Sequence, residues 1–479
     1  MNKLYMNGKW IESASGRRFD VLNPASGEVI GQVADGNAKD TQKAIQAAHD
    51  ACESWAHTLP KDRTQLLSDT ARAILVNREH LARVLTQENG KPMHEASSEI
   101  AYAADFFTWF SEEAKRVYGR TVPSNVPDRR RMVIKQPVGP VGAITPWNFP
   151  LAMIARKVAP ALAAGCPVVV KPAEQTPLSA IELFRVFHDS GFPRGTVNLI
   201  TCSDPVKVGN ELLHDERIRK ITFTGSAEVG KFIMKECADQ LKRVSLELGG
   251  NAPVIVFNDA NIEKAVQKVV ASKFRCAGQT CICPNRIFVQ RDIAGTFSET
   301  LAQTVKTLRV GDGIKSDTQI GPLIDKQGLE KVKTHVADAV SRGARCLIGG
   351  NTPADQALRN GFFFEPTVLV NVTTVMKIFN EETFGPVAPI IAFGTEKEVL
   401  EMANSTPYGL SGYVYTNDLG RAFRVSERLE CGIVGVNDER PSVPECPFGG
   451  LKQSGIGREG GSEGIEEFTE TKYISFGID

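Results

Sequence analysis

The chain has no excess charge of either sign, because its 56 lysines and arginines are matched by 56 aspartates and glutamates. Without a basic surplus, neither a nucleic-acid partner nor attraction to an anionic membrane surface is favoured. It also lacks a long uninterrupted apolar run. The longest stretch, residues 151–170, contains Arg156, Lys157 and Pro160. We therefore predict a buried helix followed by a strand there, and not a membrane span.

Other common signals are missing as well. The first ten residues lack the apolar core of a signal peptide. The 10 cysteines are scattered irregularly, which is typical of reduced thiols in a cytosolic protein and not of a disulfide framework. No repeat is visible, which disfavours a solenoid or propeller. With 479 residues, the chain is predicted to be a cytoplasmic protein of two or three domains.

Short β-branched runs alternate with helical patterns over most of the chain. Strands are predicted at 168–170, 221–223 and 254–257, and helices at 41–55, 63–88, 178–184, 227–241 and 262–274. Strands separated by helices indicate βαβ units and a mostly parallel sheet covered on both faces. Two segments, 120–136 and 467–476, are extended and lie outside this pattern. They are predicted to form a small appendage that pairs between subunits, or else a pair of surface ribbons.

Cys281 and Glu247 are the side chains that point most directly to chemistry. A cysteine thiol is a good nucleophile near neutral pH, and a carboxylate can activate water, so together they could perform covalent acyl transfer. Asn148, on the proline-stiffened loop 145–150, could donate to an oxyanion. Each residue also has an ordinary interpretation, as a buried thiol, a solvated carboxylate at a strand end, and a helix cap respectively.

Phosphate and metal signals are weaker. Residues 455–460 match G-x-G-x-x-G but follow no predicted strand, and the chain ends too soon afterwards for a βαβ unit. Residues 222–230 are better placed, because they run from a predicted strand into a helix whose N-terminus could receive a pyrophosphate. The cysteines at 276, 281 and 283 match no common zinc or iron–sulfur spacing. No metal site is predicted.

Taken together, these motifs resemble the aldehyde dehydrogenase superfamily, and the resemblance spans essentially the whole chain. The ordered motifs are residues 145–150, 171–174, 223–230, 246–250, 278–281, 382–386 and 447–450. The resemblance implies an α/β fold and a homodimer or homotetramer. The implied parts are a Rossmann-type dinucleotide domain at 1–118 and 138–247, a catalytic domain at 248–437, an oligomerisation appendage at 119–137 and 465–479, and a segment lining the substrate pocket at 438–464.

The resemblance also implies residue roles. Cys281 matches the nucleophile, Glu247 the general base and Asn148 the oxyanion donor. The implied cofactor-binding residues are Trp147, Lys171, Glu174, Gly225, Ser226, Gly230, Leu248, Glu382 and Phe384. Among them, Lys171 and Glu174 would hold the adenosine ribose. Glu174 would repel the extra phosphate of NADP by about 4 kcal/mol at about 4 Å and an effective dielectric near 20. NAD is therefore the preferred cofactor, and NADP is possible because Lys171 offsets part of the repulsion.

Within the superfamily the chain is most similar to succinate-semialdehyde dehydrogenases. Arg156, Arg275 and Ser442 match that group's carboxylate-binding residues, and two guanidiniums with a hydroxyl would form a suitable clamp. The alternative is that each arginine is tied to a structural carboxylate. Cys276 stands where the group usually has Asn. The predicted reaction is oxidation of succinate semialdehyde to succinate through a thioester on Cys281.

Three other functions remain open. The substrate could be another short aldehyde such as glutarate semialdehyde. An acylating enzyme would pass the acyl group to coenzyme A, but such a route has little need for Glu247 as a base. A non-catalytic dinucleotide-binding relative would have no need for the Cys281, Glu247 and Asn148 set.

Cys283 could form a reversible disulfide with Cys281 that stops activity under oxidation.

Overall fold

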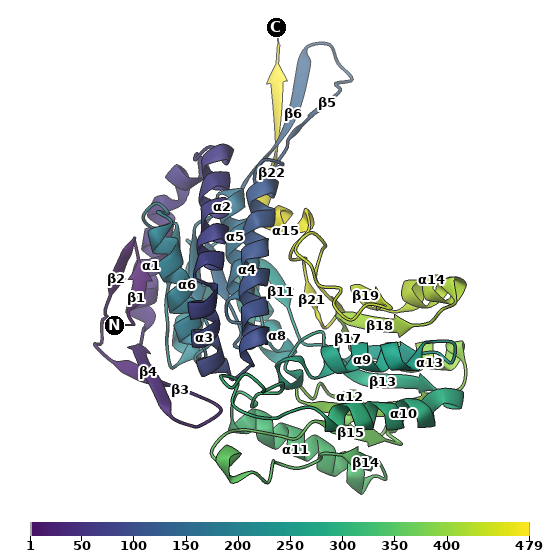
Figure 1. The fold of residues 1–479 in the computed structure, drawn as a ribbon. Coiled ribbons are helices and arrows are strands. Elements are labelled where there is room, and N and C mark those ends of the chain that lie inside the picture. Colours follow the sequence, from purple (N-terminus) through teal and green to yellow (C-terminus); the bar gives the residue numbers. More distant parts are fainter. Residues whose placement is uncertain (1, 479) are drawn as a thin grey trace.

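The computed structural model describes residues 2–478 and shows two mostly parallel sheets, each packed with helices (Figure 1). This arrangement confirms the predicted α/β class. Within the described residues, no helix is long and apolar enough to cross a membrane.

The first sheet has the strand order β2-β1-β9-β8-β7-β10-β11-β21. Its strands are β2 Lys9–Ile11, β1 Leu4–Met6, β9 Val197–Leu199, β8 Val168–Lys171, β7 Val141–Ile144, β10 Lys220–Thr224, β11 Arg243–Glu247 and β21 Gly455–Ile456. The pairs from β9 to β11 are parallel, whereas β1, β2 and β21 pair antiparallel at the two edges. The β21 strand shows that the G-x-G-x-x-G match belongs to an edge strand, where its residue Gly455 pairs with Glu247.

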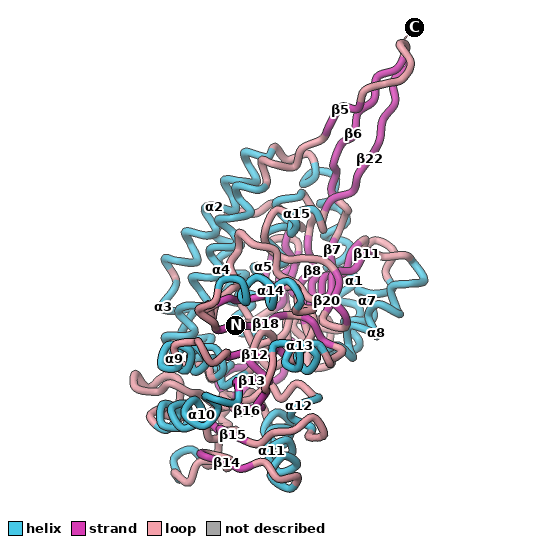
Figure 2. Tube along the Cα trace, turned by 90° about the vertical axis from the view of Figure 1, so that its right-hand side faces the viewer, coloured by secondary structure: helices cyan, strands magenta, loops and turns pink. Residues whose placement is uncertain are grey.

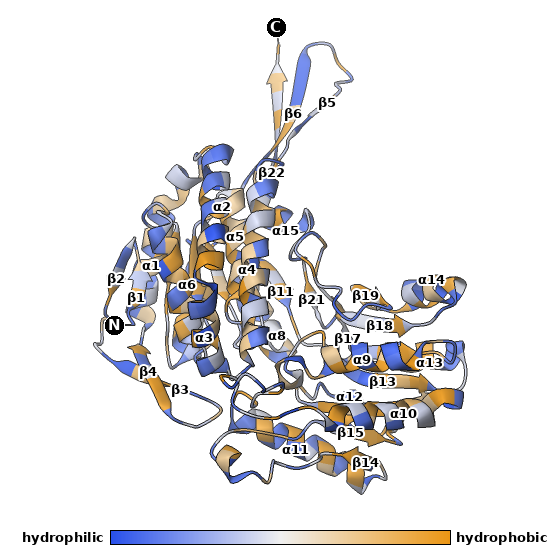
Figure 3. Ribbon diagram, in the orientation of Figure 1, coloured by the Kyte–Doolittle hydropathy of each residue, from blue (hydrophilic) through white to orange (hydrophobic). Residues whose placement is uncertain are grey.

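The helices that pack with this sheet include α1 Ala38–Ala56, α2 Pro60–Val76, α3 Arg78–Asn89, α4 Met93–Glu113, α5 Ala152–Ala164, α6 Pro177–Asp189, α7 Pro205–His214 and α8 Ala227–Cys237. Every residue of α5 is buried, because it packs between the sheet and the α2–α4 layer. The predicted buried helix followed by a strand is therefore confirmed as α5 and β8. Apolar and hydrophilic residues alternate along these helices (Figure 3), and apolar residues such as Leu67 and Phe107 are buried.

Two predicted helices have different boundaries. The helix predicted at 63–88 is divided at Asn77, whose φ and ψ of −92° and 11° are not helical and whose side chain donates to the Ala73 carbonyl. The helix predicted at 227–241 ends at Cys237, after which a short 3₁₀ turn leads to Leu241 in the left-handed region. In both places local backbone geometry interrupts a periodic apolar pattern.

The second sheet has the order β14-β15-β16-β13-β12-β18-β19. Its strands are β14 Arg345–Ile348, β15 Thr367–Val370, β16 Val387–Phe393, β13 Pro284–Gln290, β12 Ala252–Val256, β18 Ser411–Tyr415 and β19 Ile433–Val436. Its helices are α9 Ile262–Lys273, α10 Arg291–Lys306, α11 Lys326–Ser341, α12 Lys377–Asn380, α13 Glu396–Asn404 and α14 Leu419–Arg428. Each large sheet has its own buried apolar core.

A three-stranded arm projects from the body of the molecule (Figures 1 and 2). It consists of β5 Arg120–Val122, β6 Arg129–Pro137 and β22 Thr469–Gly477, in the order β22-β6-β5. The two extended segments predicted from the sequence therefore pair with each other, along the whole of β22. The remaining elements are the hairpin β3 Arg18–Leu22 with β4 Val29–Ala34, the pair β17 Tyr408–Gly409 with β20 Leu451–Lys452, and the short helix α15 Glu463–Glu466.

Candidate active site

Two cavities meet at Cys281. The larger, of about 610 Å³, is lined by residues of α4, α5, α9 and the 440–448 segment, and the smaller, of about 350 Å³, opens among the loops that follow β7, β10 and β11. Cys281 lines both. The carboxyl ends of parallel strands are where open α/β sheets bind ligands. The arrangement therefore gives one thiol access to two separate binding spaces.

The turn that presents Cys281 has an unusual backbone. Cys276, Ala277 and Gly278 have φ values of 50°, 54° and 76°, so three successive residues lie in the left-handed region between α9 and β13. Left-handed φ is costly for residues other than glycine, and asparagine tolerates it better than most. The Glu95 carboxylate accepts a hydrogen bond from the Cys276 backbone N–H at 2.8 Å, which helps hold this strained turn.

Burial sets the protonation of the two reactive groups. Burial, followed by the nearby Glu247 carboxyl, raises the pKa of the Cys281 thiol well above its usual value. Burial also raises the pKa of Glu247 to about 7, and neither of its carboxylate oxygens has a hydrogen-bond partner among the described residues. A carboxyl group that titrates near neutral pH is well suited to act as a general base.

Asn148 lies in the loop after β7, is buried, and lines the smaller cavity with Glu247. Its side-chain Nδ2 donates to the Gln279 carbonyl at 3.0 Å. The structure thus brings Asn148 and Glu247 into the smaller cavity alongside Cys281. An amide with a second N–H available beside the thiol can stabilise an oxyanion on a carbonyl attacked there.

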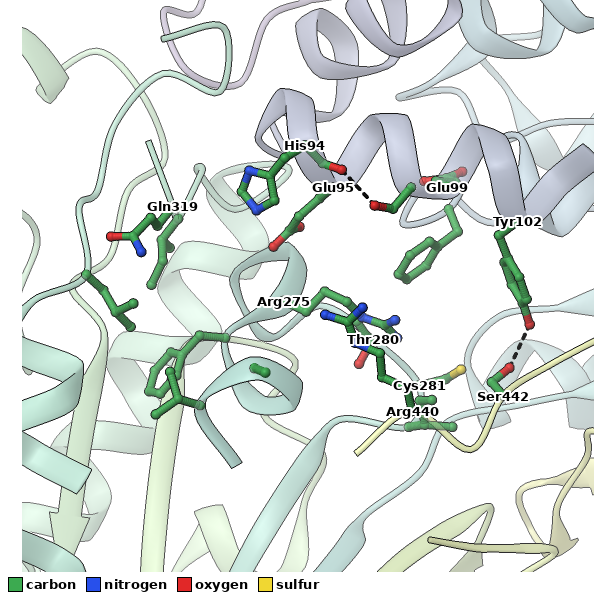
Figure 4. A pocket seen from close by; sticks show the side chains of 18 of the residues that line it. His94, Glu95, Glu99, Tyr102, Arg275, Thr280, Cys281, Gln319, Arg440 and Ser442 are labelled. Carbon is green, nitrogen blue, oxygen red and sulfur yellow. Dashed lines mark hydrogen bonds between the residues drawn. The ribbon is translucent and has the colours of Figure 1, made fainter. Parts of the chain in front are cut away.

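The proposed carboxylate binders lie together in the larger cavity (Figure 4). Arg275 forms no ion pair with any described residue and lies 5.3 Å above the Phe149 ring. The Ser442 hydroxyl is 2.7 Å from the Tyr102 hydroxyl. Arg275 is therefore available to a ligand, whereas the Ser442 hydroxyl is shared with Tyr102.

Arg156 differs from the other two substrate candidates. Its Nε lies 2.9 Å from a Glu459 oxygen, and its guanidinium stacks 3.9 Å above the Phe448 ring. Glu459 also pairs with the buried ammonium of Lys157. In this structure Arg156 is therefore tied to a buried carboxylate, as the alternative interpretation of the sequence predicted. Its Nη2 has no acceptor among the described residues, so one donor remains for a ligand.

The smaller cavity contains most of the predicted cofactor residues: Trp147, Gly225, Ser226, Leu248, Glu382 and Phe384. Trp147 and Phe384 meet edge to face with ring centroids 5.5 Å apart, and a Glu382 oxygen accepts from the Gly250 N–H at 3.0 Å. Ser226, which lines this cavity, is the N-cap of α8, and its hydroxyl accepts from the Val229 N–H. This combination fits a dinucleotide.

Lys171, Glu174 and Gly230 do not line this cavity, which extends as far as Gln175 on that side. Lys171 pairs with Glu174 at 3.2 Å. Gly230 serves packing, because a Cβ there would come within 2.5 Å of the Leu248 side chain. Their cofactor roles stay predictions.

Cys283 is buried and directed at α9. The Lys273 ammonium donates to its sulfur at 3.2 Å, and both side chains are buried. A disulfide with Cys281 would require Cys283 to give up this contact, and the disulfide remains a prediction.

Several residues at the site carried no signal in the sequence. Glu459 reaches Arg156 and Lys157 from the far end of the chain, Tyr102 comes from α4, and Arg440 lines the larger cavity without an ion pair to any described residue. The nearest signal was the predicted pocket-lining role of residues 438–464, which include Arg440 and Glu459.

Comparisons with known proteins define the class. The family model described as "Aldehyde dehydrogenase family" matches residues 10–474. The chain is 49% identical to a glutarate-semialdehyde dehydrogenase of Pseudomonas putida over 99% of this chain and 97% of the relative. It is also 49% identical, with the same coverage, to the Escherichia coli succinate-semialdehyde dehydrogenase whose name specifies NADP(+). The crystal structure of a Staphylococcus aureus betaine aldehyde dehydrogenase with NAD+ is 39% identical, covers 100% of this chain and 95% of its own, and has a TM-score of 0.97.

The fold is that of a dehydrogenase of known structure, and Cys281 lies where two cavities of this chain meet. The chain belongs to the aldehyde dehydrogenase family. The family and fold implied by the sequence motifs are thereby confirmed.

Proposed function

We propose that this protein oxidises succinate semialdehyde to succinate with NAD(P)+ through a thioester on Cys281. The observation that carries the proposal is the position of Cys281 between a cavity where Arg275 and Arg440 have no ion pair with a described residue and a second cavity suited to a dinucleotide. A panel of succinate semialdehyde, glutarate semialdehyde and butanal, assayed by NADH formation, tests it. Succinate semialdehyde should have the highest kcat/KM.

The first half of the reaction takes place at Cys281. The Cys281 thiol releases its proton to solvent, and the resulting thiolate adds to the aldehyde carbon. The Asn148 amide and the Cys281 backbone N–H hold the resulting oxyanion. Bound in the smaller cavity, NAD(P)+ would accept the hydride, and a thioester would remain on Cys281.

The second half releases the product. Glu247 removes a proton from a water molecule, which attacks the thioester carbon and expels the Cys281 sulfur. Succinate then leaves by the larger cavity. Glu247 must be unprotonated for this step. An acylating route, in which coenzyme A replaces water as the attacking group, would leave this buried base unused.

Replacing Arg275 with alanine is expected to raise KM for succinate semialdehyde about 10- to 100-fold, because a charged hydrogen bond to the substrate carboxylate contributes about 1.5–3 kcal/mol. The values of kcat and kcat/KM for butanal should change little, since this aldehyde has no carboxylate. An equal loss on butanal would remove Arg275 from the carboxylate site. Steady-state kinetics on both aldehydes make the comparison.

We expect NAD+ to be preferred to NADP+, because Glu174 is an acid with Lys171 as its only ion-pair partner among the described residues. Replacing Glu174 with alanine should reduce the ratio of kcat/KM for NAD+ over NADP+ by about tenfold, which corresponds to about a third of the Coulomb repulsion between adjacent charges. A parent enzyme that favours NADP+, or a ratio unchanged in the variant, would contradict the assignment.

A second substrate is supported by the size and charge of the larger cavity. Its volume of about 610 Å³ exceeds what a four-carbon aldehyde needs, and Arg440 adds a third guanidinium to its lining. Glutarate semialdehyde, which places its carboxylate one methylene farther from Cys281, would fit this space. In that case glutarate semialdehyde, and not succinate semialdehyde, would show the highest kcat/KM in the same panel.

The proposed setting is a cytoplasmic homodimer or homotetramer. All ten cysteines are free thiols, as a reducing compartment requires. In the arm, β22 is an edge strand with Tyr473 and Phe476 exposed, which supports pairing with a second copy of the chain. We also propose that Lys171 binds the adenosine ribose of NAD(P), and that a reversible Cys281–Cys283 disulfide stops activity under oxidation.

A further inference from the structure

The loop that carries Asn148 is held from behind by the turn between α3 and α4. The Asn89 side chain donates to the Trp147 carbonyl at 2.9 Å. The Lys91 ammonium donates to the Asn148 carbonyl at 2.6 Å. Both contacts are made to the main chain, so they fix the position of the loop without occupying the Asn148 amide.

The same lysine also ties this loop to the helix that follows it. Lys91 is 2.6 Å from one Glu99 oxygen, and the other Glu99 oxygen accepts from the N–H groups of Leu151 and Ala152 at 3.0 and 3.2 Å, at the start of α5. The side chains of Lys91 and Glu99 are 1% and 0% exposed. A buried ion pair with its donors satisfied holds a single geometry, because every alternative leaves a charge unpaired.

The turn is built to bring Lys91 to this position. Gly90 ends α3 with a φ of 90°, and a Cβ there would lie 2.4 Å from Pro322. The chain can therefore reverse direction tightly enough for the next residue to reach the Asn148 carbonyl. The Lys91 ammonium also lies 3.9 Å from the ring centre of Phe149, the residue that follows Asn148.

We propose that Lys91 is a positioning residue for the oxyanion donor: by holding the Asn148 main chain and, through Glu99, the start of α5, it places the Asn148 amide where the oxyanion forms. The inference rests on the proposed thioester mechanism. Displacement of a stabilising group by about 1 Å can cost about 10²-fold in rate, so the loss of this clamp acts on kcat before it acts on binding.

A double-mutant cycle tests this role. Lys91→Met should lower kcat about 10- to 100-fold with KM changed less than about threefold. Asn148→Ala should lower kcat by about 10²–10³. In the Asn148→Ala background, Lys91→Met should have almost no further effect, because it acts through a group that is already gone. A Lys91→Met effect of the same size in both backgrounds, or no effect in either, would overturn the inference.

Lys242→Met is the matched control. Lys242 is another largely buried lysine that donates to main-chain carbonyls, those of Asp215 and Ile218, and it lines neither cavity. The Lys242→Met variant should keep kcat within about twofold of the parent, even if its melting temperature falls as far as that of Lys91→Met. A loss of kcat in Lys242→Met equal to that in Lys91→Met would show a general cost of removing a buried lysine and would overturn the inference.

Two further measurements keep the result interpretable. If Lys91→Met does not fold, Lys91→Gln, which keeps a donor near both acceptors, replaces it in the same cycle with a smaller expected loss of kcat. The rate of the first NADH burst should fall with kcat, since the oxyanion forms in that step. An inactive parent enzyme, or full activity of Asn148→Ala, would refute the proposed mechanism itself. Assays of those two proteins alone therefore separate a failure of the mechanism from a failure of the Lys91 inference.

Discussion

Replacing Cys281 with alanine is expected to lower kcat for aldehyde oxidation by about 10⁴-fold or more, the size of effect seen when a covalent nucleophile is removed from an enzyme that works through one. No other cysteine lines both cavities. The neighbouring Cys283 is directed at Lys273 and cannot take over. Because Cys281 is only partly exposed and the change removes a single sulfur, the fold should be preserved.

The rate of NADH formation with saturating succinate semialdehyde measures this loss, and thermal unfolding checks the fold. Cys52→Ala is a matched control, since Cys52 lies on α1, lines neither cavity and is also partly exposed. It should keep the activity of the parent. A Cys281→Ala protein that still oxidises the aldehyde within about tenfold of the parent would exclude a cysteine mechanism.

Replacing Glu247 with glutamine is expected to block release of the product more than formation of the thioester. General-base catalysis contributes about 10²–10⁴-fold, so steady-state turnover should fall by that factor. A first burst of NADH of about one equivalent per active site should remain, because hydride leaves before water is needed.

The pH dependence provides an independent test of the same residue. Burial raises the pKa of Glu247 to about 7, and the base acts only when it is unprotonated. In the parent enzyme, kcat should therefore be level above about pH 7 and fall tenfold per pH unit below it. In Glu247→Gln this limb should be absent. A variant that keeps both the turnover and the acid limb of the parent would assign the base to another residue.

The sequence was most informative where short motifs carry the chemistry. Cys281, Glu247 and Asn148 could be selected as candidates from ordered motifs, and α5 with β8 could be predicted from a mostly apolar stretch, because both signals are local. The mostly parallel sheet was predicted for the same reason, since buried strands such as residues 168–170 are compact β-branched runs.

Long-range pairing could not be predicted. The Arg156–Glu459 ion pair joins α5 to the segment that follows β21, and neither residue has a neighbour in sequence that indicates the other. The left-handed φ of Cys276 and Ala277 is equally hidden, because neither residue type favours it and tertiary contacts such as the Glu95 hydrogen bond impose it. The break at Asn77 is a local effect that the apolar pattern masked.

Mass spectrometry of Glu247→Gln mixed with NAD+ and succinate semialdehyde tests the central claim most directly. The proposed mechanism predicts that the intact protein gains the mass of one succinyl group, that the added group lies on the peptide containing Cys281, and that hydroxylamine removes it. A protein that produces one equivalent of NADH but carries no acyl group on that peptide would contradict it.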